Sequence, residues 1–290
     1  MTDLPTIEQI NKVLTELKGL SLQDVSYDTI FEKLANELKI IPFVTAILKR
    51  GHYIERGRIN EKDQAFNSES ELSYRTDNEN IKKYGRANCP NQSMFYGAVK
   101  SEFIDYPRIV NLLEISGLFR DGDLISDGEF FFTVGKWKIK EDFEVVEVVF
   151  DEKTIERIPE IKKAYEYHLD NLKKIFPDKT EEFSTILKFF SDEFAKKNIS
   201  SNHDYKISAI YTNMAIVNRG HKGVLYPSVR TEGQGRNIVL PIETVDNYLE
   251  LEKVAMFKIL KQGDRAEISN IAVALELGEN RNSFNWVYYN

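Results

Sequence analysis

Apolar residues recur at helical spacing near the start of the chain. Between residues 7 and 17 they fall every three or four positions, and the pattern repeats between residues 27 and 38, ahead of Pro42. This spacing predicts two amphipathic helices. From residue 49 to residue 90 the chain is polar and has no sustained period, which indicates loops with short strands.

Short apolar runs alternate with helical patterns through the rest of the chain. The run MFY predicts a strand at 94–96, and the next apolar stretch predicts a helix that ends at Gly117. Residues rich in β-branched and aromatic side chains predict strands between 130 and 150. The remaining expected elements are helices at 154–175, 180–197 and 204–217, strands at 224–229 and 237–242, and a hairpin around Gln262 and Gly263.

The sequence contains no internal repeat and no low-complexity linker. We therefore expect a helical N-terminal extension at 1–45, followed by one domain at 46–290. The mixture of helical and strand patterns predicts the α+β fold class.

Composition narrows the classes of function. The 290 residues carry a net charge of -7, so we expect no direct nucleic-acid binding, because phosphate contacts are made by clustered Lys and Arg. Cys89 is the single cysteine, which excludes an internal disulfide and fits a reducing cytosol. The N-terminus lacks a targeting pattern, and the longest apolar run, IIPFVTAIL, is shorter than the ~20 residues that cross a bilayer. These features predict a cytoplasmic protein.

Motifs of common cofactor and metal sites are missing or misplaced. GQGRN at 233–237 lies between two expected strands, whereas a Rossmann fingerprint joins a strand to a helix. The chain has no P-loop, and its four histidines form neither an HExxH nor a His-x-His pair. No serine lies in a GxSxG elbow. We therefore expect no bound cofactor and no metal site.

Three separated stretches carry a different combination of residues. IERGRIN at 54–60 places two arginines one residue apart, and YGRANCPNQSMFYG at 84–97 adds a third. LYPSVRTEGQGRN at 225–237 adds a serine and further arginines. Together with the helix that carries Glu114, these stretches resemble the RES domain family, which is named for its Arg, Glu and Ser. The resemblance covers residues 46–260 in the same order.

This resemblance implies a compact α+β fold similar to that of ADP-ribosyltransferases. It implies that NAD is a substrate, whose nicotinamide-ribose bond is broken by hydrolysis or phosphorolysis. It also implies a toxin whose partner is an antitoxin with a DNA-binding helix-turn-helix. The two N-terminal helices could dock that antitoxin or a second copy of the chain, and they could equally pack on their own domain.

The residues in these stretches fit such a substrate. Guanidinium groups bind phosphate oxygens bidentately, which suits Arg56 with Arg58 or Arg86 to the diphosphate of NAD. The leaving nicotinamide is already cationic, so the developing oxocarbenium needs a nearby anion, which Glu114 supplies. Tyr96 offers a ring face and a hydroxyl to the nicotinamide. The resemblance also assigns Ser228 to catalysis, and Gly85, Asn88, Tyr226, Arg230 and Asn237 to substrate binding.

Two of these assignments have alternatives in the sequence. Glu102 lies nearer than Glu114 to the expected strand with Tyr96, but Glu114 ends an apolar helical stretch of the type that the family shows. Arg50 in ILKRG could take the place of Arg56, although the RxR at 56–58 is closer to the family pattern. We prefer Glu114 and Arg56.

Other functions and simpler interpretations remain open. The same NAD-binding residues would serve an ADP-ribosyltransferase that modifies a macromolecule. The RES-like core would also serve as the scaffold of a non-enzymatic interaction protein. Each residue has a structural interpretation as well: a salt-bridged surface arginine, a core tyrosine, or a serine that closes a turn.

Overall fold

The computed structural model describes residues 4–61, 64–116, 127–263 and 265–289. Its contacts divide the chain into two interleaved units. The first, here called the helical unit, consists of Met1–Ala46, Asp77–Ser93 and Glu144–Gly233. The second, the sheet unit, consists of Ile47–Thr76, Met94–Phe143 and Gln234–Asn290. The N-terminal segment expected as a separate extension therefore groups with segments from the middle of the chain.

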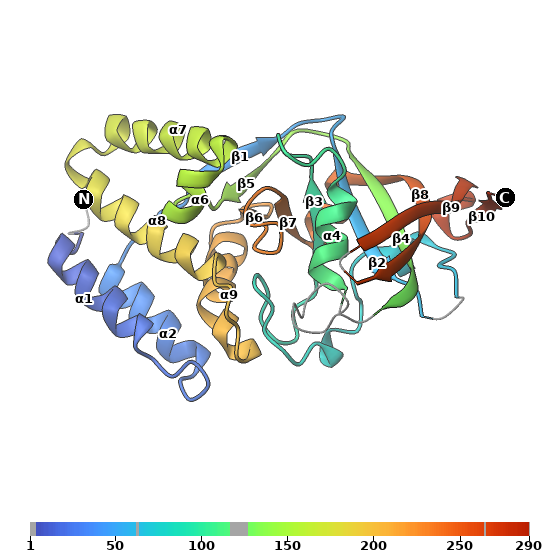
Figure 1. The fold of residues 1–290 in the computed structure, drawn as a ribbon. Coiled ribbons are helices and arrows are strands. Elements are labelled where there is room, and N and C mark those ends of the chain that lie inside the picture. The colour runs from blue at the N-terminus through green and yellow to red at the C-terminus, as the bar shows by residue number, and fades with distance from the viewer. Residues whose placement is uncertain (1–3, 62–63, 117–126, 264, 290) are drawn as a thin grey trace. The chain divides into compact units, whose positions relative to one another are not determined.

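The helical unit contains most of the helices (Figure 1). Its elements are α1 (Ile7–Lys18), α2 (Tyr27–Lys33), η1 (Leu34–Leu38), η2 (Asn78–Asn80), α6 (Glu152–Arg157), α7 (Pro159–Ile175), η3 (Pro177–Lys179), α8 (Thr180–Phe194), η4 (Asn202–Tyr205), α9 (Lys206–Asn213), η5 (Met214–Asn218) and β6 (Val224–Pro227). The strands β1 (Thr45–Leu48) and β5 (Phe143–Glu147) lie where the chain passes from one unit to the other.

Local sequence explains the first two helices. Thr6 accepts a hydrogen bond from the Gln9 amide while the Gln9 side chain accepts one from the Thr6 amide, so a capping box begins α1. Ser26 caps α2 by accepting from the Thr29 amide. The apolar face of α1 is buried, as its spacing requires. The prediction of two amphipathic N-terminal helices is confirmed.

The single helix expected at 154–175 is wrong, because the chain forms α6 and α7 instead. Asp151 caps α6, and Ile158 then adopts an extended conformation with φ -116 and ψ 103. The residue before a proline is disfavoured in the helical region, and Pro159 is well suited to the first turn of a new helix. The break is therefore local and lies at Ile158.

One apolar cluster forms part of the core of the helical unit. It joins residues of α6–α8 and of the segment after β5. Its buried members are Val44, Val149, Phe150, Ile158, Ile161, Leu172, Phe183 and Leu187. Beside it, β5 and β6 pair in parallel, with Val146 opposite Val224 and Glu147 opposite Leu225.

The sheet unit is built on antiparallel strands in the order β7-β3-β2-β4-β8-β9-β10. Its elements are β2 (Tyr53–Ile59), α3 (Glu69–Leu72), β3 (Met94–Val99), α4 (Pro107–Ile115), β4 (Gly128–Ile139), β7 (Arg236–Pro241), α10 (Ile242–Tyr248), β8 (Leu249–Gln262), β9 (Arg265–Glu276), η6 (Glu279–Arg281) and β10 (Asn285–Tyr288). The expected β8–β9 hairpin is confirmed, while α10 and β10 were not expected.

The helix α4 covers one face of this sheet and contacts β2, β3 and β7 (Figure 1). It begins at Pro107, the favoured first position of a helix, and ends at Ile115. Leu112 packs there against Phe132, Val134 and Phe257. The expected end at Gly117 lies outside the described residues. Helices and strands in both units place the chain in the α+β class.

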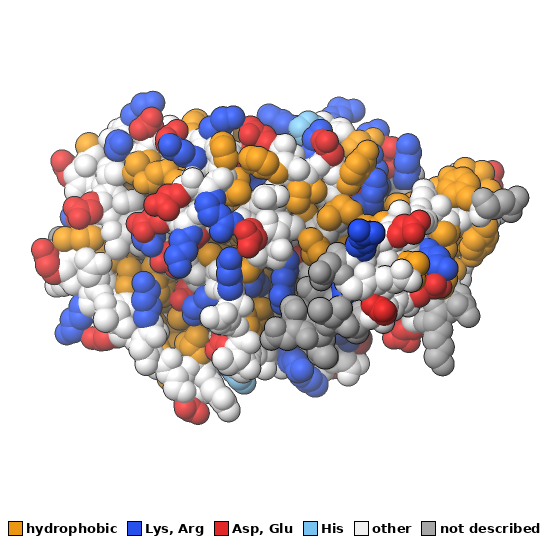
Figure 2. All heavy atoms as spheres, in the orientation of Figure 1, with side chains coloured by type: hydrophobic (Ala, Val, Ile, Leu, Met, Phe, Trp, Pro, Cys, Tyr) orange, Lys and Arg blue, Asp and Glu red, His pale blue; other side chains and the backbone are white. Residues whose placement is uncertain are grey.

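In the described ranges, every helix is too short or too polar for a bilayer crossing. The same residues contain no group of three or more His, Cys, Asp or Glu side chains placed to hold a metal ion. On the face drawn in Figure 2, basic and acidic side chains are interspersed.

Candidate functional site

The residues selected from the sequence fall into both units. The sheet unit contains Arg56, Arg58, Tyr96, Glu114 and Asn237, and the helical unit contains Gly85, Arg86, Asn88, Tyr226, Ser228 and Arg230. Each group has its own geometry.

In the sheet unit, the structure joins Glu114 to Asn237. Asn237 lies on β7, is only 6% exposed, and donates from Nδ2 to Oε1 of Glu114 on α4 over 2.9 Å. In the pairing of β3 with β7, Asn237 is opposite Ala98, so both side chains face α4. Tyr96 precedes Ala98 by two residues and therefore faces the same way. A half-buried carboxylate, an amide and a tyrosine thus share one face of the sheet.

The helix that carries Glu114 is held in place by Glu55, a residue that the sequence interpretation missed. Glu55 is 5% exposed on β2, and its carboxylate accepts from the Arg108 amide at 2.7 Å and from Arg108 Nη1 at 3.1 Å. Asn111 Nδ2 donates to the Glu55 carbonyl oxygen at 2.8 Å. A carboxylate that contacts the first turn of a helix also meets the positive end of the helix dipole. Glu55 therefore fixes α4 against the sheet.

Arg56 binds backbone carbonyl groups in the sheet unit. Its Nε donates to the carbonyl oxygens of Leu72 and Ser73, each at 3.1 Å, and its Nη1 donates to that of Tyr96 at 2.6 Å. The guanidinium also lies 5.1 Å from the ring centre of Phe95. The paired residues of β2 and β3 end at Glu55 and Ala98, so Arg56 extends the contact between these strands beyond their ladder.

Burial lowers the pKa of Arg56 to about 10, and the charge of Arg58 contributes in the same direction. The side chain still carries its charge at neutral pH. Arg58 itself donates to the carbonyl oxygen of Glu71, with its guanidinium 5.3 Å from the ring centre of Phe66. Both arginines therefore hold α3 and its flanking residues against β2.

The sheet separates Arg56 from Glu114. Successive side chains of a strand point to opposite faces, and Glu55 points toward α4. Arg56 therefore points away from α4, where it meets Phe95. The expected convergence of these two side chains on one ligand does not occur within the sheet unit.

In the helical unit, Arg86 closes the end of α8. It donates from Nη1 to the carbonyl oxygen of Phe194 and from Nη2 to that of Lys196 at 3.1 Å. Its guanidinium lies 4.9 Å from the ring centre of Tyr205. A cation at these carbonyl groups satisfies the free acceptors of the helix end. Arg86 thus has a structural role in the described contacts.

The neighbouring predicted residues are parts of tight turns or of the core. The Gly85 amide donates to the Asn88 carbonyl oxygen at 3.0 Å, and Asn88 Nδ2 donates to the Cys89 carbonyl oxygen at 3.0 Å. Tyr226 is 3% exposed, with its ring centre 5.0 Å from that of Phe194. These residues shape the helical unit.

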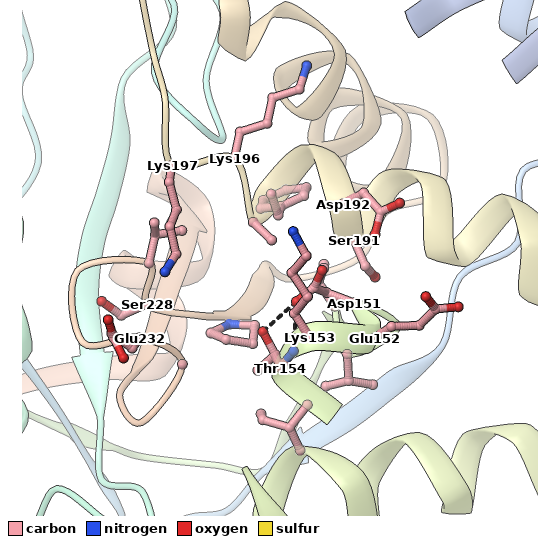
Figure 3. A pocket seen from close by; sticks show the side chains of 18 of the residues that line it. Asp151, Glu152, Lys153, Thr154, Ser191, Asp192, Lys196, Lys197, Ser228 and Glu232 are labelled. Carbon is pink, nitrogen blue, oxygen red and sulfur yellow. Dashed lines mark hydrogen bonds between the residues drawn. The ribbon is translucent and has the colours of Figure 1, made fainter. Parts of the chain in front are cut away.

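Ser228 follows β6 and closes a turn. Its hydroxyl accepts from the Thr231 amide at 3.3 Å, and its carbonyl oxygen accepts from the Gly233 amide at 2.8 Å. Arg230, within the turn, is exposed. Ser228 also lines a hollow in the helical unit, which Figure 3 shows with Ser191 and several charged side chains around it.

Both sequence alternatives lie elsewhere. Glu102 and Arg50 are exposed, and the Arg50 amide donates to Asp142 Oδ1 at 2.8 Å. The contact with Asn237 is made by Glu114. Burial raises the pKa of the Cys89 thiol to about 12, so it is protonated at neutral pH and unsuited to nucleophilic attack.

No model of a known protein family matches the sequence, and no curated protein matches it.

Proposed function

We propose that this protein cleaves the nicotinamide-ribose bond of NAD, with Glu114 as the acidic group. The pairing of Glu114 with Asn237 on the α4 face of the sheet is the observation that carries the proposal. The resemblance of the sequence to RES domains supplies the substrate. We also propose that the fold is of the ADP-ribosyltransferase type.

The chemistry asks for one well-placed anion. Nicotinamide leaves as a neutral group from a cationic pyridinium, so no side chain has to protonate it. Positive charge develops on the ribose as the bond breaks, and a fixed carboxylate stabilises that charge without reorganising. Asn237 orients the Glu114 carboxylate through its amide, which is itself held by a buried position on β7. Glu55 anchors the start of α4, the helix that carries Glu114, by accepting from the Arg108 amide.

Tyr96 and Arg56 have different roles in this proposal. The Tyr96 ring, on the same face as Glu114, offers a surface for the nicotinamide. Arg56 is a positioning residue, because it holds the backbone of β3 through the Tyr96 carbonyl oxygen. Its guanidinium does not bind the diphosphate in this arrangement.

The proposal is tested by incubating the purified protein with NAD, with and without inorganic phosphate, and following nicotinamide and the ribose product by chromatography. Nicotinamide release with free ADP-ribose indicates hydrolysis, and a product that depends on phosphate indicates phosphorolysis. Radiolabel that moves from NAD onto a protein or nucleic acid would replace the proposal with ADP-ribose transfer. A folded sample that binds NAD without releasing nicotinamide would favour the interaction-protein alternative.

A toxin role follows only if cleavage occurs in the cell. We expect induced expression to lower cellular NAD and to stop growth, and the Glu114→Gln variant to do neither at equal protein level. Growth arrest by this variant would show that toxicity has another cause. Co-purification with a small helix-turn-helix protein would identify the proposed antitoxin partner.

A further inference from the structure

A hollow of ≈ 610 Å³ lies entirely within the helical unit. Its walls come from the segment after β5, from α6 and α8, from the residues that follow α8, and from the turn after β6 (Figure 3). Pockets for small organic ligands have volumes of roughly 300–1,000 Å³. The hollow is therefore the size of a mononucleotide site and much larger than an inorganic phosphate needs.

The carboxylates that line the hollow are already engaged. Asp151 caps α6 by accepting from the amide and the hydroxyl of Thr154, at 2.9 and 2.6 Å. Asp192 pairs with Lys188 at 3.0 Å, and Glu152 lies 3.7 Å from the same ammonium group. These contacts hold α6 and α8 together at one wall.

The remaining carboxylate and two of the cations are paired as well. Glu232 accepts from Arg157 Nη2 at 3.1 Å, which ties the turn after β6 to α6. Lys196 pairs with Glu193 on α8, and its side chain extends away from the hollow in Figure 3. Neither cation is free to meet a ligand without breaking a contact.

Two lysines are left over. Lys153 on α6 and Lys197 after α8 are exposed, and within the described ranges neither has an acidic partner. In Figure 3, Lys197 extends toward the turn that carries Ser228 and Glu232, and Lys153 extends from α6 toward the end of α8. Two lysines from different segments therefore line one hollow, and lysine ammonium groups bind phosphate as point charges.

Apolar and hydroxyl groups complete the lining. Val148, Pro227 and Val229 offer apolar surface, and Ser191 and Ser228 add hydroxyls. Ligand sites combine such apolar walls with a few polar groups that fix orientation. A ring system against the apolar wall with phosphate at the lysines would use both kinds of surface.

We propose that this hollow binds a nucleoside diphosphate, with Lys153 and Lys197 on the phosphates and the base against the apolar wall. The site is built from the helical unit alone, whereas the proposed NAD chemistry uses Glu114 and Asn237 of the sheet unit. The inference therefore stands whether or not the protein cleaves NAD.

The test is titration calorimetry of the full chain with ADP, adenosine and inorganic phosphate. We expect one ADP per chain, with affinity that falls as salt rises, and binding at least about tenfold weaker for adenosine, since one charge-assisted contact is worth that factor or more. The double variant Lys153→Ala/Lys197→Ala should weaken ADP binding by about a hundredfold. The control double variant Lys83→Ala/Lys174→Ala removes two exposed lysines from the same unit and should bind ADP like the parent.

Three results would overturn the proposal. One is no ADP binding to a folded parent protein, and another is ADP affinity unchanged in the Lys153→Ala/Lys197→Ala variant. The third is inorganic phosphate that binds as tightly as ADP, which would reduce the site to an anion site. If Glu114→Gln loses ADP binding while the Lys153→Ala/Lys197→Ala variant keeps it, the nucleotide binds in the sheet unit instead.

Discussion

Arg56 offers the sharpest test of how the sheet unit is held together. Replacing it by alanine removes the donors for the carbonyl oxygens of Leu72, Ser73 and Tyr96 in one step. Tyr96 lies on β3, while the other two acceptors lie at the end of α3. The substitution therefore removes the contacts that Arg56 makes between β2 and two neighbouring segments.

The loss of stability in Arg56→Ala can be estimated from the contacts that Arg56 makes. A buried carbonyl that loses its partner costs about 1–3 kcal/mol, so three of them set an upper range of about 3–9 kcal/mol. Burying the guanidinium itself carries a desolvation cost, which its lowered pKa reflects and which the variant no longer has. We therefore expect Arg56→Ala to lower the free energy of unfolding by about 3–5 kcal/mol, the lower part of that range.

Tryptophan fluorescence is suited to this measurement. Trp137 and Trp286 are the two tryptophans of the chain, and both lie in the sheet unit. Trp137 is 1% exposed and meets Phe95 edge to face, with ring centres 5.3 Å apart. The Phe95 ring is also the one that the Arg56 guanidinium contacts. Urea unfolding followed by this signal therefore reports on the segment that Arg56 stabilises.

Two further variants separate the possible causes. Arg56→Lys keeps a charge but not the planar fork that serves three acceptors, so its stability should lie between those of Arg56→Ala and the parent. Arg50→Ala removes an exposed arginine of the same unit and should change stability by less than about 0.5 kcal/mol. If Arg56→Ala lowers the free energy of unfolding by less than about 1 kcal/mol, with an unchanged slope in urea, Arg56 does not hold these segments together as we infer.

Further predictions concern the carboxylate, a crowded glycine and the thiol. Glu114→Gln should lower NAD cleavage about a hundredfold or more without lowering stability, whereas Glu102→Gln should cleave NAD like the parent; equal loss in both would contradict the assignment. A Cβ at Gly57 would lie 2.1 Å from the Phe132 ring, so Gly57→Ala should cost at least about 1–3 kcal/mol in urea unfolding, and adding Phe132→Leu should recover part of it. Because burial raises the pKa of Cys89 to about 12, its thiolate fraction at pH 8.5 is about 0.0003, and we expect reaction with a disulfide reagent to be about a thousandfold slower than in urea. Reactivity of the native thiol close to that in urea would show that the group is not shielded.

Local pattern accounted for much of the secondary structure. The capping and spacing of α1 and α2 are properties of consecutive residues, and so is the β8–β9 turn at Gly263, whose φ is 55. Even the missed break between α6 and α7 was present in the sequence, because Pro159 disfavours helical geometry at Ile158. Element type follows from short-range sterics and periodicity, which a sequence displays directly.

The candidate site was predicted less completely. The sequence selected Glu114 and Asn237, and the structure joins them across 123 residues. It selected Arg56 and Arg86 as phosphate ligands, whereas both donate to backbone carbonyl groups in the structure. An arginine that donates to backbone carbonyl groups and an arginine that binds phosphate look the same in a sequence.

The sequence by itself determined the helical faces, the antiparallel hairpin and the α+β class, since each depends on neighbours within a few residues. Only the tertiary structure decided which face of β2 carries Glu55 and which carries Arg56, because that depends on where α4 packs. It also decided that Lys153 and Lys197 border one hollow with Ser228. Such groupings follow from contacts between segments that are distant in the sequence, and local patterns do not predict the free energy of those contacts.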